Sequence, residues 1–315
     1  MLDLMRLSTT LRSNHVSRFC FDRGLMMAAR MNLDSLFFEY TSSKSLDITT
    51  NIGCPVGCRY CPQKLVVKRY LASHNSPRFM TKIIFSKCIS NVPKEIPLSF
   101  SGFSEPFINK DCIDFIELAA SEERPLTVFT TLFGTSHEVL DRLRLIHFED
   151  FCVHLPDNES TMSLEPDDDY LNILNDLIKK PPDNCRFVTI GGHLHPRVKQ
   201  PIKKAGFRVN IQIVNDRAGN INESSSLVNR CYWKGPIRCV SGMSRFVLLP
   251  NGETFLCCMD FGLDHCMGNL LNVRYEDLCQ SPSFNDIVSA MKRPGPDIIC
   301  RRCNYARPIG RRNHH

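Results

Sequence analysis

Residues 51–63 read NIGCPVGCRYCPQ and carry three cysteines within eight residues, Cys54, Cys58 and Cys61. Thiolates are the usual ligands of iron–sulfur clusters. Three thiolates on one loop hold three irons of a cubane cluster and leave the fourth iron open to a substrate or cofactor. The proline and glycine between the cysteines favour a loop over a helix. The spacing therefore predicts a cluster with one exchangeable position.

A structural zinc site is the first alternative to the cluster. Zinc normally takes four ligands, usually from two paired C-x2-C motifs, whereas the next cysteine after Cys61 is Cys88. Three inert buried thiols are the second alternative. The cysteines follow a predicted strand directly and are flanked by glycine and proline, which argues against chance. We therefore interpret Cys54, Cys58 and Cys61 as cluster ligands.

The composition is that of a globular protein with little disorder. The 315 residues are 43% hydrophobic and 23% charged, enough for one large domain with a small appendix. We find no apolar run of membrane-spanning length and no convincing secretory signal, so we expect a cytoplasmic protein without a membrane partner. The 16 cysteines then favour metal or redox chemistry over disulfides.

The net charge of +6 is mild, and part of it lies in the last fifteen residues. A basic tail can contact nucleic acid, but a solvated terminus is the simpler interpretation. We do not expect a nucleic-acid partner.

Short β-rich runs alternate with helical patterns through the first two thirds of the chain. The predicted strands are Leu46–Asn51, Ile96–Ser101, Leu126–Thr131, Phe151–Leu155, Arg186–Ile190 and Phe207–Val214. The predicted helices are Thr81–Val92, Asp111–Ala120, Ser136–Ile146, Asp167–Lys180 and Pro196–Ala205. Such alternation favours parallel strands joined by right-handed crossovers. Six strands are two short of a closed eight-stranded barrel, so the pattern predicts a partial (β/α)6 barrel.

The rhythm changes near Cys231. Ser244–Leu249 and Glu253–Cys257 read as two strands around a Pro-Asn-Gly turn, and Ser281 caps a short helix that begins with proline. We therefore expect an N-terminal extension over residues 1–40, a barrel over 41–230, a small cluster domain over 231–306 and a basic tail over 307–315.

The run NIGCPVGCRYCPQ resembles the signature of the radical S-adenosylmethionine (SAM) superfamily. The resemblance implies a partial (β/α)6 barrel, one [4Fe–4S] cluster on the three cysteines, bound SAM, and a 5′-deoxyadenosyl radical that abstracts hydrogen. It also implies a Gly-Gly-Glu-like turn after the second strand, which here reads SGFSEP from Ser101, with Ser104 in place of the usual glycine. Gly102, Ser104 and Glu105 are the implied SAM-binding residues.

Two further residues are expected at the SAM site. The ring of Tyr60 can pack beside the adenine. Arg217 follows the last predicted barrel strand, and its planar guanidinium suits the carboxylate of SAM or an anionic group of the substrate.

A second set of cysteines lies near the C-terminus. Cys239, Cys257, Cys300 and Cys303 resemble the ligands of a twitch domain, a shortened SPASM domain. Four thiolates fill a cubane cluster and suit it to electron transfer or structure. One auxiliary [4Fe–4S] cluster is therefore expected, with zinc as the alternative because the set ends in a C-x2-C motif. Metal binding stays open for the remaining cysteines of this region: Cys231, Cys258, Cys266 and Cys279.

Polar residues after the later barrel strands are weaker candidates for the reaction chamber. They are Asp157, Glu159, His193, His195, Asn215 and Asp216. Asp260 follows the paired cysteines, and we favour a turn-capping role for it.

The resemblance implies an oxidoreductase-type enzyme with two clusters. An external one-electron reductant such as flavodoxin or ferredoxin reduces the first cluster, and the radical takes hydrogen from an alcohol of a sugar- or cyclitol-like molecule. The auxiliary cluster then accepts the substrate's electron. A maturase that modifies a peptide or protein is one alternative. A non-enzymatic, zinc-stabilised binding module is another. The substrate, small molecule or peptide, is not identified by the sequence.

Overall fold

A computed structural model describes residues 45–72, 76–221, 230–241, 243 and 245–309. The predicted N-terminal extension, residues 1–40, lies outside the described residues, and so does most of the predicted basic tail. Each helix in these described ranges is too short or too polar to cross a bilayer.

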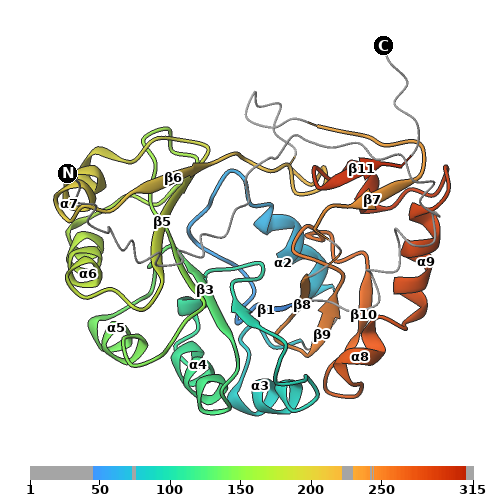
Figure 1. Ribbon diagram of the computed structural model, residues 1–315, viewed down its shortest axis with the longest axis horizontal. Helices are drawn as coiled ribbons and strands as arrows, with labels where there is room; N and C mark the ends of the chain where they lie inside the picture. The colour runs from blue at the N-terminus through green and yellow to red at the C-terminus, as the bar shows by residue number, and fades with distance from the viewer. Residues whose placement is uncertain (1–44, 73–75, 222–229, 242, 244, 310–315) are drawn as a thin grey trace, which may run out of the picture.

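The core of the fold is a curved sheet whose first six strands are parallel (Figure 1). All six predicted strands are confirmed, with neighbours in the order of the chain. They are β1 (Ser45–Ile48), β2 (Leu98–Phe100), β3 (Leu126–Thr130), β4 (Asp150–His154), β5 (Cys185–Ile190) and β6 (Val209–Gln212). The partial barrel predicted from the periodicity is therefore present.

Five predicted helices fill the connections and line the outer side of the sheet (Figure 1). Their starts follow from capping, because Thr81, Ser136 and Asp167 each accept a hydrogen bond from a backbone N–H three residues on. The helices are α3 (Lys82–Ile89), α4 (Cys112–Ser121), α5 (His137–Leu143), α6 (Asp168–Lys179) and α7 (Pro196–Lys204).

One barrel helix was not predicted. Helix α2 (Gln63–Leu71) begins two residues after Cys61, with Pro62 at its N-cap. Proline offers no capping side chain, and the first turn has no acidic residue. The usual start signals are therefore absent from its sequence.

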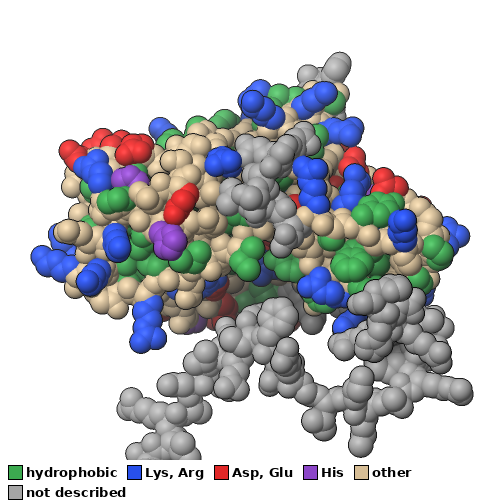
Figure 2. Space-filling view, turned by 90° about the horizontal axis from the view of Figure 1, so that it is seen from above, with side chains coloured by type: hydrophobic (Ala, Val, Ile, Leu, Met, Phe, Trp, Pro, Cys, Tyr) green, Lys and Arg blue, Asp and Glu red, His purple; other side chains and the backbone are tan. Residues whose placement is uncertain are grey.

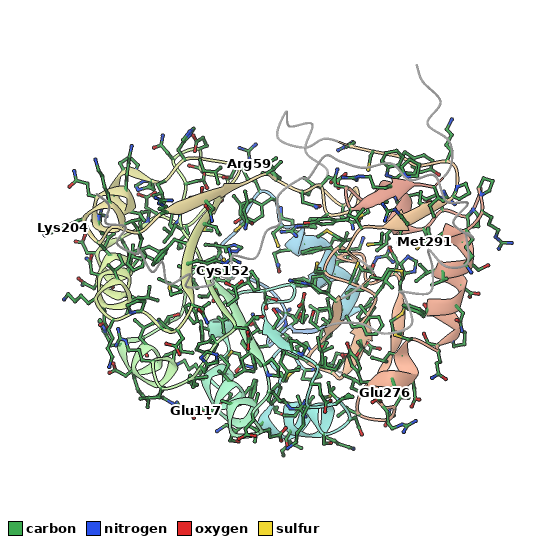
Figure 3. The ribbon with its side chains drawn as sticks, in the orientation of Figure 1. Arg59, Glu117, Cys152, Lys204, Glu276 and Met291 are labelled. Carbon is green, nitrogen blue, oxygen red and sulfur yellow. The ribbon has the colours of Figure 1, made fainter. Side chains whose placement is uncertain are left out.

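The two faces of the sheet differ in polarity. Apolar residues such as Leu46, Phe100 and Val153 face the helices and belong to the main core. Side chains alternate along a strand, so Asp47, Ser99 and other polar residues face the inner side. Figure 3 shows this for Cys152 of β4, which lies inside the arc, while Glu117 and Lys204 extend outward from the helices. The inner face therefore carries polar side chains among apolar ones such as Phe129.

The C-terminal region continues the same sheet. Strand β8 (Arg245–Leu248) pairs in parallel with β1, and β9 (Glu253–Phe255) and β10 (Cys266–Asn269) follow in antiparallel order, which gives nine strands. The predicted hairpin is confirmed as β8 and β9. The division at residue 231 stays a prediction, since the sheet itself runs across it. The remaining elements are β7 (Ile237–Cys239), α8 (Tyr275–Leu278), α9 (Pro282–Met291), the 3-10 helix η3 (Ile299–Arg302) and β11 (Ala306–Pro308), which pairs with β7.

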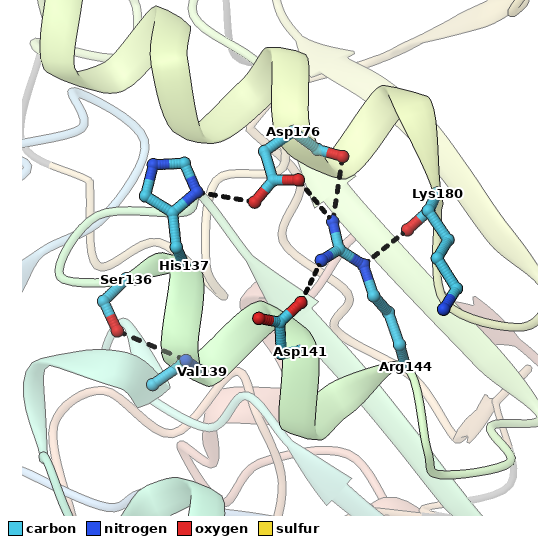
Figure 4. Close-up of polar contacts among 7 residues, drawn as sticks. All are labelled: Ser136, His137, Val139, Asp141, Arg144, Asp176 and Lys180. Atoms are coloured by element: carbon cyan, nitrogen blue, oxygen red, sulfur yellow. Dashed lines mark hydrogen bonds and ion pairs between the residues drawn. The ribbon is translucent and has the colours of Figure 1, made fainter.

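Arg144 joins helices α5 and α6 through one polar network (Figure 4). Its Nε donates to the carbonyl of Lys180 at 2.8 Å, and its Nη2 donates to the carbonyl and the carboxylate of Asp176, both at 2.9 Å. His137 contacts the same carboxylate at 2.5 Å. The hydrogen bond from His137, then the charge and hydrogen bond of Arg144, hold the pKa of Asp176 below its usual range. The network satisfies carbonyls at the C-terminus of α6.

The face shown in Figure 2 carries Lys and Arg side chains at many separate points, with acidic and apolar side chains between them. The coloured part of this face therefore shows scattered positive charge rather than one continuous basic patch.

Candidate active site

The three-cysteine loop follows β1 and is held by its own backbone. The N–H of Cys61 donates to the carbonyl of Cys58 at 3.0 Å, and Arg59 N donates to Thr161 O at 2.8 Å. Gly57 has φ +67°, a conformation that favours glycine. These contacts fix the three thiols on a tight turn at the C-terminal end of the first parallel strand, where active sites of such barrels form.

The three thiols lie close together in a desolvated place. Burial, with a smaller contribution from the nearby Cys61, raises the pKa of Cys54 to about 11 and that of Cys58 to about 12. Burial also raises the pKa of Cys61, while the charge of Arg217 lowers it. A buried thiol gives up its proton when a metal replaces it. The donor set therefore fits a cluster that supplies the missing positive charge.

Gln63 is a site residue that the sequence reasoning missed. Its Nε2 donates to Sγ of Cys61 at 3.1 Å and also to the carbonyl of Phe103, while its Oε1 is buried without a partner among the described residues. The amide thus links the cysteine loop to the loop after β2. Its position two residues after the last cysteine was the available signal, but only the fold shows what it contacts.

The loop after β2 packs directly on the end of β1. Gly102 has φ +59°, and a Cβ there would lie 2.0 Å from Oγ1 of Thr49, so only glycine fits. The same threonine oxygen accepts a hydrogen bond from Phe103 N at 3.1 Å, and Ser104 Oγ donates to Asn51 at 3.2 Å. Gly102 and Ser104 therefore lie beside the cysteine loop, as the resemblance implied.

Glu105 is buried and already well satisfied. Its two carboxylate oxygens accept from Thr130 Oγ1 at 2.7 Å, from Thr131 N at 2.6 Å, from Thr131 Oγ1 at 2.7 Å and from Phe107 N at 3.4 Å. Burial raises its pKa, although these donors act against the shift. The carboxylate thus joins the ends of β2 and β3. Its contact with the SAM amino group stays a prediction.

Tyr60 and Arg217 lie on the inner side of the cysteine loop. The Tyr60 ring is buried with Ile190, Val214 and Ile221, against Cys58 and Cys61. Arg217 Nε donates to the carbonyl of Tyr60 at 3.2 Å.

The guanidinium of Arg217 also lies 5.5 Å from the ring centre of Phe261, within cation–π range. Its remaining N–H groups are available to an anion. The roles of Tyr60 with adenine and of Arg217 with a carboxylate stay predictions.

The second cysteine set also comes together in space. Burial raises the pKa of Cys257, Cys300 and Cys303, the last to about 12, and neighbouring thiols add to each shift. The charges of Cys303 and Cys239 both contribute to the raised pKa of Cys300. Cys303 Sγ accepts a hydrogen bond from Tyr305 N at 3.4 Å. The charge of Cys300 likewise contributes to the raised pKa of Cys257. Cys300 therefore lies near each of the other three predicted ligands, and their binding of a cluster stays a prediction.

The other cysteines of this region differ in position. Cys258 packs with Cys61 against one apolar cluster that contains Phe103, Val247 and Phe261. Cys266 is exposed on β10, and Cys279 is buried after α8. Cys258 therefore lies between the two sets, and its metal binding stays open.

Among the described residues, no three His, Cys, Asp or Glu side chains are arranged to hold one metal ion. That geometry concerns a single ion. The thiolates of a cubane cluster bind separate irons and so lie further apart.

The weaker candidates mostly shape turns. Asp157 accepts from the backbone N–H groups of Glu159, Thr161 and Met162 at 2.8–3.0 Å, and Glu159 accepts from both the backbone and the ring of His193. These residues order the loop after β4. Asp260 accepts from the N–H groups of the two residues Asp264 and His265, which confirms the turn-capping role.

Two of the remaining weaker candidates also accept hydrogen bonds from nearby backbone N–H groups. His195 accepts from Arg197 N at the start of α7, and Asn215 accepts from Arg217 N at 2.8 Å. Asp216 is buried, and burial raises its pKa. The sequence placed these residues after strands, and the contacts of His195 and Asn215 are those of helix and loop termini.

Residues 239–304 match the SPASM family, an iron–sulfur cluster-binding domain. A curated relative is the probable dual-specificity RNA methyltransferase RlmN of Shouchella clausii (strain KSM-K16), 27% identical over 164 residues. That alignment spans 47% of this chain and 45% of the relative, less than half of either protein.

Two solved structures share the fold. BtrN in complex with AdoMet and 2-DOIA has a TM-score of 0.56 at 14% identity, covering 83% of this chain and 93% of its own. SuiB of Streptococcus suis bound to precursor peptide SuiA has a TM-score of 0.56 at 10% identity, covering 92% of this chain and 79% of its own.

The chain thus combines a partial barrel, a three-cysteine loop at the end of the first strand and a C-terminal match to the SPASM domain. The chain shares the fold of these two solved structures, and its residues 239–304 carry the match to the iron–sulfur cluster-binding domain. The family match indicates an iron–sulfur cluster in the C-terminal region.

Proposed function

We propose that the chain is a radical SAM enzyme that oxidises an alcohol of a sugar- or cyclitol-like molecule. In this proposal SAM is the source of the radical, and an auxiliary cluster is the electron acceptor. The carrying observation is that Cys61 of the first set lies close to Cys258, the chain neighbour of Cys257 in the second set. Cys61 and Cys258 pack on the same apolar cluster, and the charge of Arg217 acts on both thiols. Bound SAM supplies a hydrogen-abstracting radical, and a cluster beside the chamber supplies a place for the second electron.

The residues of the chain have separate tasks in this proposal. Cys54, Cys58 and Cys61 hold the first cluster, and Gln63 orients Cys61 through its N–H···S contact. Gly102, Ser104 and Glu105 build the wall for the methionine part of SAM. Tyr60 and Arg217 bind its adenine and its carboxylate, and the apolar cluster around Phe261 excludes water.

The auxiliary cluster is proposed to bind Cys239, Cys257, Cys300 and Cys303. The likeness to BtrN, solved with AdoMet and 2-DOIA, supports a small-molecule substrate. The cytoplasmic location and an external reductant such as flavodoxin or ferredoxin remain proposals.

Anaerobic reconstitution tests this function. The wild type is expected to bind about eight irons, as two cubane clusters require, and to release 5′-deoxyadenosine from SAM. Cys58→Ala should abolish that release. Cys300→Ala should retain uncoupled release yet lose oxidation of a cyclitol substrate. Equal loss of both activities in Cys300→Ala would contradict the division of work, and a colourless zinc protein would favour a binding module.

A peptide-modifying enzyme is the second candidate. It is supported by the likeness to SuiB bound to its precursor peptide over most of this chain. Mass spectrometry separates the two candidates. A peptide-modifying enzyme lowers the mass of the peptide by the mass of the hydrogen atoms removed and leaves a cyclitol unchanged.

A further inference from the structure

The inner wall of the barrel carries an unusual set of cations around one aromatic ring. Phe129 of β3 lies 5.8 Å from the Arg186 guanidinium and 6.0 Å from that of Arg245, measured to the ring centre. The ring of His154 meets it edge-on at 6.1 Å. Phe129 and Arg186 flank Cys152 in register across three neighbouring strands, and Cys152 marks this wall in Figure 3.

The two arginines differ in their electrostatic balance. Arg186 makes a bidentate ion pair with Asp150, with both N–O distances 2.6 Å. Arg245 is exposed, and its side chain has no hydrogen bond or ion pair with any described residue. Its nearest acidic influence is Asp47, one position further along the inner face. A guanidinium held only by an aromatic ring keeps its five N–H donors for a ligand.

Asp47 is a second, independent sign of a ligand in this space. It is 2% exposed, and its Oδ1 has no hydrogen-bond partner among the described residues. A buried carboxylate oxygen without a donor is costly. Burial raises its pKa to about 6, with the charge of Arg245 acting against the shift. The oxygen is placed to accept a hydrogen bond from a polar molecule in the chamber.

Three arginines act on residues of the inner side of the sheet. Arg217 and Arg245 both act on Cys258, and Arg217 and Arg186 both act on His154, whose pKa burial and these charges lower to about 4. The three guanidinium groups therefore face one space, in which Asp47 and Asp150 are the acidic neighbours identified. If the carboxylate of SAM binds Arg217, the guanidinium of Arg245 is still available to bind the substrate.

We propose that the substrate carries an anionic group, a phosphate or a carboxylate, and that Arg245 binds this group beside Phe129. The inference rests on the proposed function, because it takes the inner chamber as the place where the substrate reacts. It narrows the substrate class from neutral polyols to phosphorylated or carboxylated ones. Guanidinium recognises both anions through paired N–H···O contacts, so the two sources need separate tests.

The test uses the full chain, reconstituted with both clusters and saturated with SAM, so that the SAM carboxylate occupies its own site. Calorimetric titrations at constant ionic strength use inorganic phosphate in one arm and acetate in the other. The wild type should bind at least one anion. Arg245→Gln should bind it at least about tenfold more weakly, and Arg245→Lys should recover part of the loss. Arg274→Gln is the matched control, since Arg274 is exposed beside Asp277.

Each other outcome overturns the proposal. Binding of both anions by Arg245→Gln at wild-type strength would place the anion elsewhere, as would an equal loss in Arg274→Gln. A wild type that binds neither anion would remove the site. Release of 5′-deoxyadenosine without substrate is measured in the same samples. If the wild type releases 5′-deoxyadenosine but binds no anion, only the proposed anion site is refuted. If the wild type releases no 5′-deoxyadenosine, the proposed function is refuted.

Discussion

Arg301 offers the sharpest test of how the fold builds the auxiliary site. Its side chain is 1% exposed and donates to five backbone carbonyls. These are Pro296 at 2.7 Å, Trp233 and Gly235 at 2.8 Å, Ala290 at 2.9 Å, and Arg293. All five N–H donors of the guanidinium are therefore engaged. The residue ties the segment after Arg230 and the end of α9 to η3, which carries Cys300.

The magnitude of a substitution follows from these bonds. Lysine keeps the charge but has three donors, so at least two buried carbonyls of Arg301→Lys lose their partner. Each costs about 1–3 kcal/mol, which gives about 2–6 kcal/mol of lost stability. Arg302→Lys is the matched control, because that side chain is 43% exposed and has one ion pair with Asp297 at 3.8 Å. We expect about 0–1 kcal/mol for the control.

Trp233 is the only tryptophan in the chain and one of the acceptors, so its fluorescence reports unfolding next to the substitution. Anaerobic urea titrations are compared with iron content. Arg301→Lys should unfold at a lower urea concentration and lose about four irons, one cubane's worth, while keeping uncoupled SAM cleavage. Wild-type unfolding together with full iron content would refute the reasoning.

Three further predictions concern other parts of the molecule. Gln63→Leu removes the N–H···S contact to Cys61. The reduction potential of the first cluster should become more negative, and activity should fall about 10–100-fold. An unchanged potential in a redox titration would contradict this prediction. Gly102→Ala places a Cβ 2.0 Å from Thr49 Oγ1 and should abolish SAM binding in equilibrium dialysis, whereas Gly206→Ala, where a Cβ meets nothing within 4 Å, controls for strained backbone and should retain it. Arg144→Met breaks the network between α5 and α6 and should cost about 3–5 kcal/mol in urea unfolding, while Asp141→Asn, at a carboxylate 73% exposed, should cost about 0–1 kcal/mol; equal losses would argue against the network.

Several features of the site were expected from local sequence but acquired meaning only from long-range contacts. The spacing of Cys54, Cys58 and Cys61 predicted the loop, and Cys257 was expected as a ligand from the resemblance to a twitch domain. Gln63 could not be assigned, because its partners Cys61 and Phe103 lie on different loops. Glu105 was expected at the SAM site, yet its contacts with Thr130 and Thr131 depend on the pairing of neighbouring strands.

The amino-acid sequence by itself determined the barrel strands, the capped helices and the hairpin of β8 and β9, because alternation, capping and turn preferences act over a few residues. Only the tertiary structure decided that β8 pairs with β1, two hundred residues earlier, and so joins the C-terminal region to the barrel sheet. It also decided that Arg245 faces Phe129 and that Arg301 gathers five carbonyls. Such contacts depend on the folded arrangement of distant strands and loops, which local patterns do not specify.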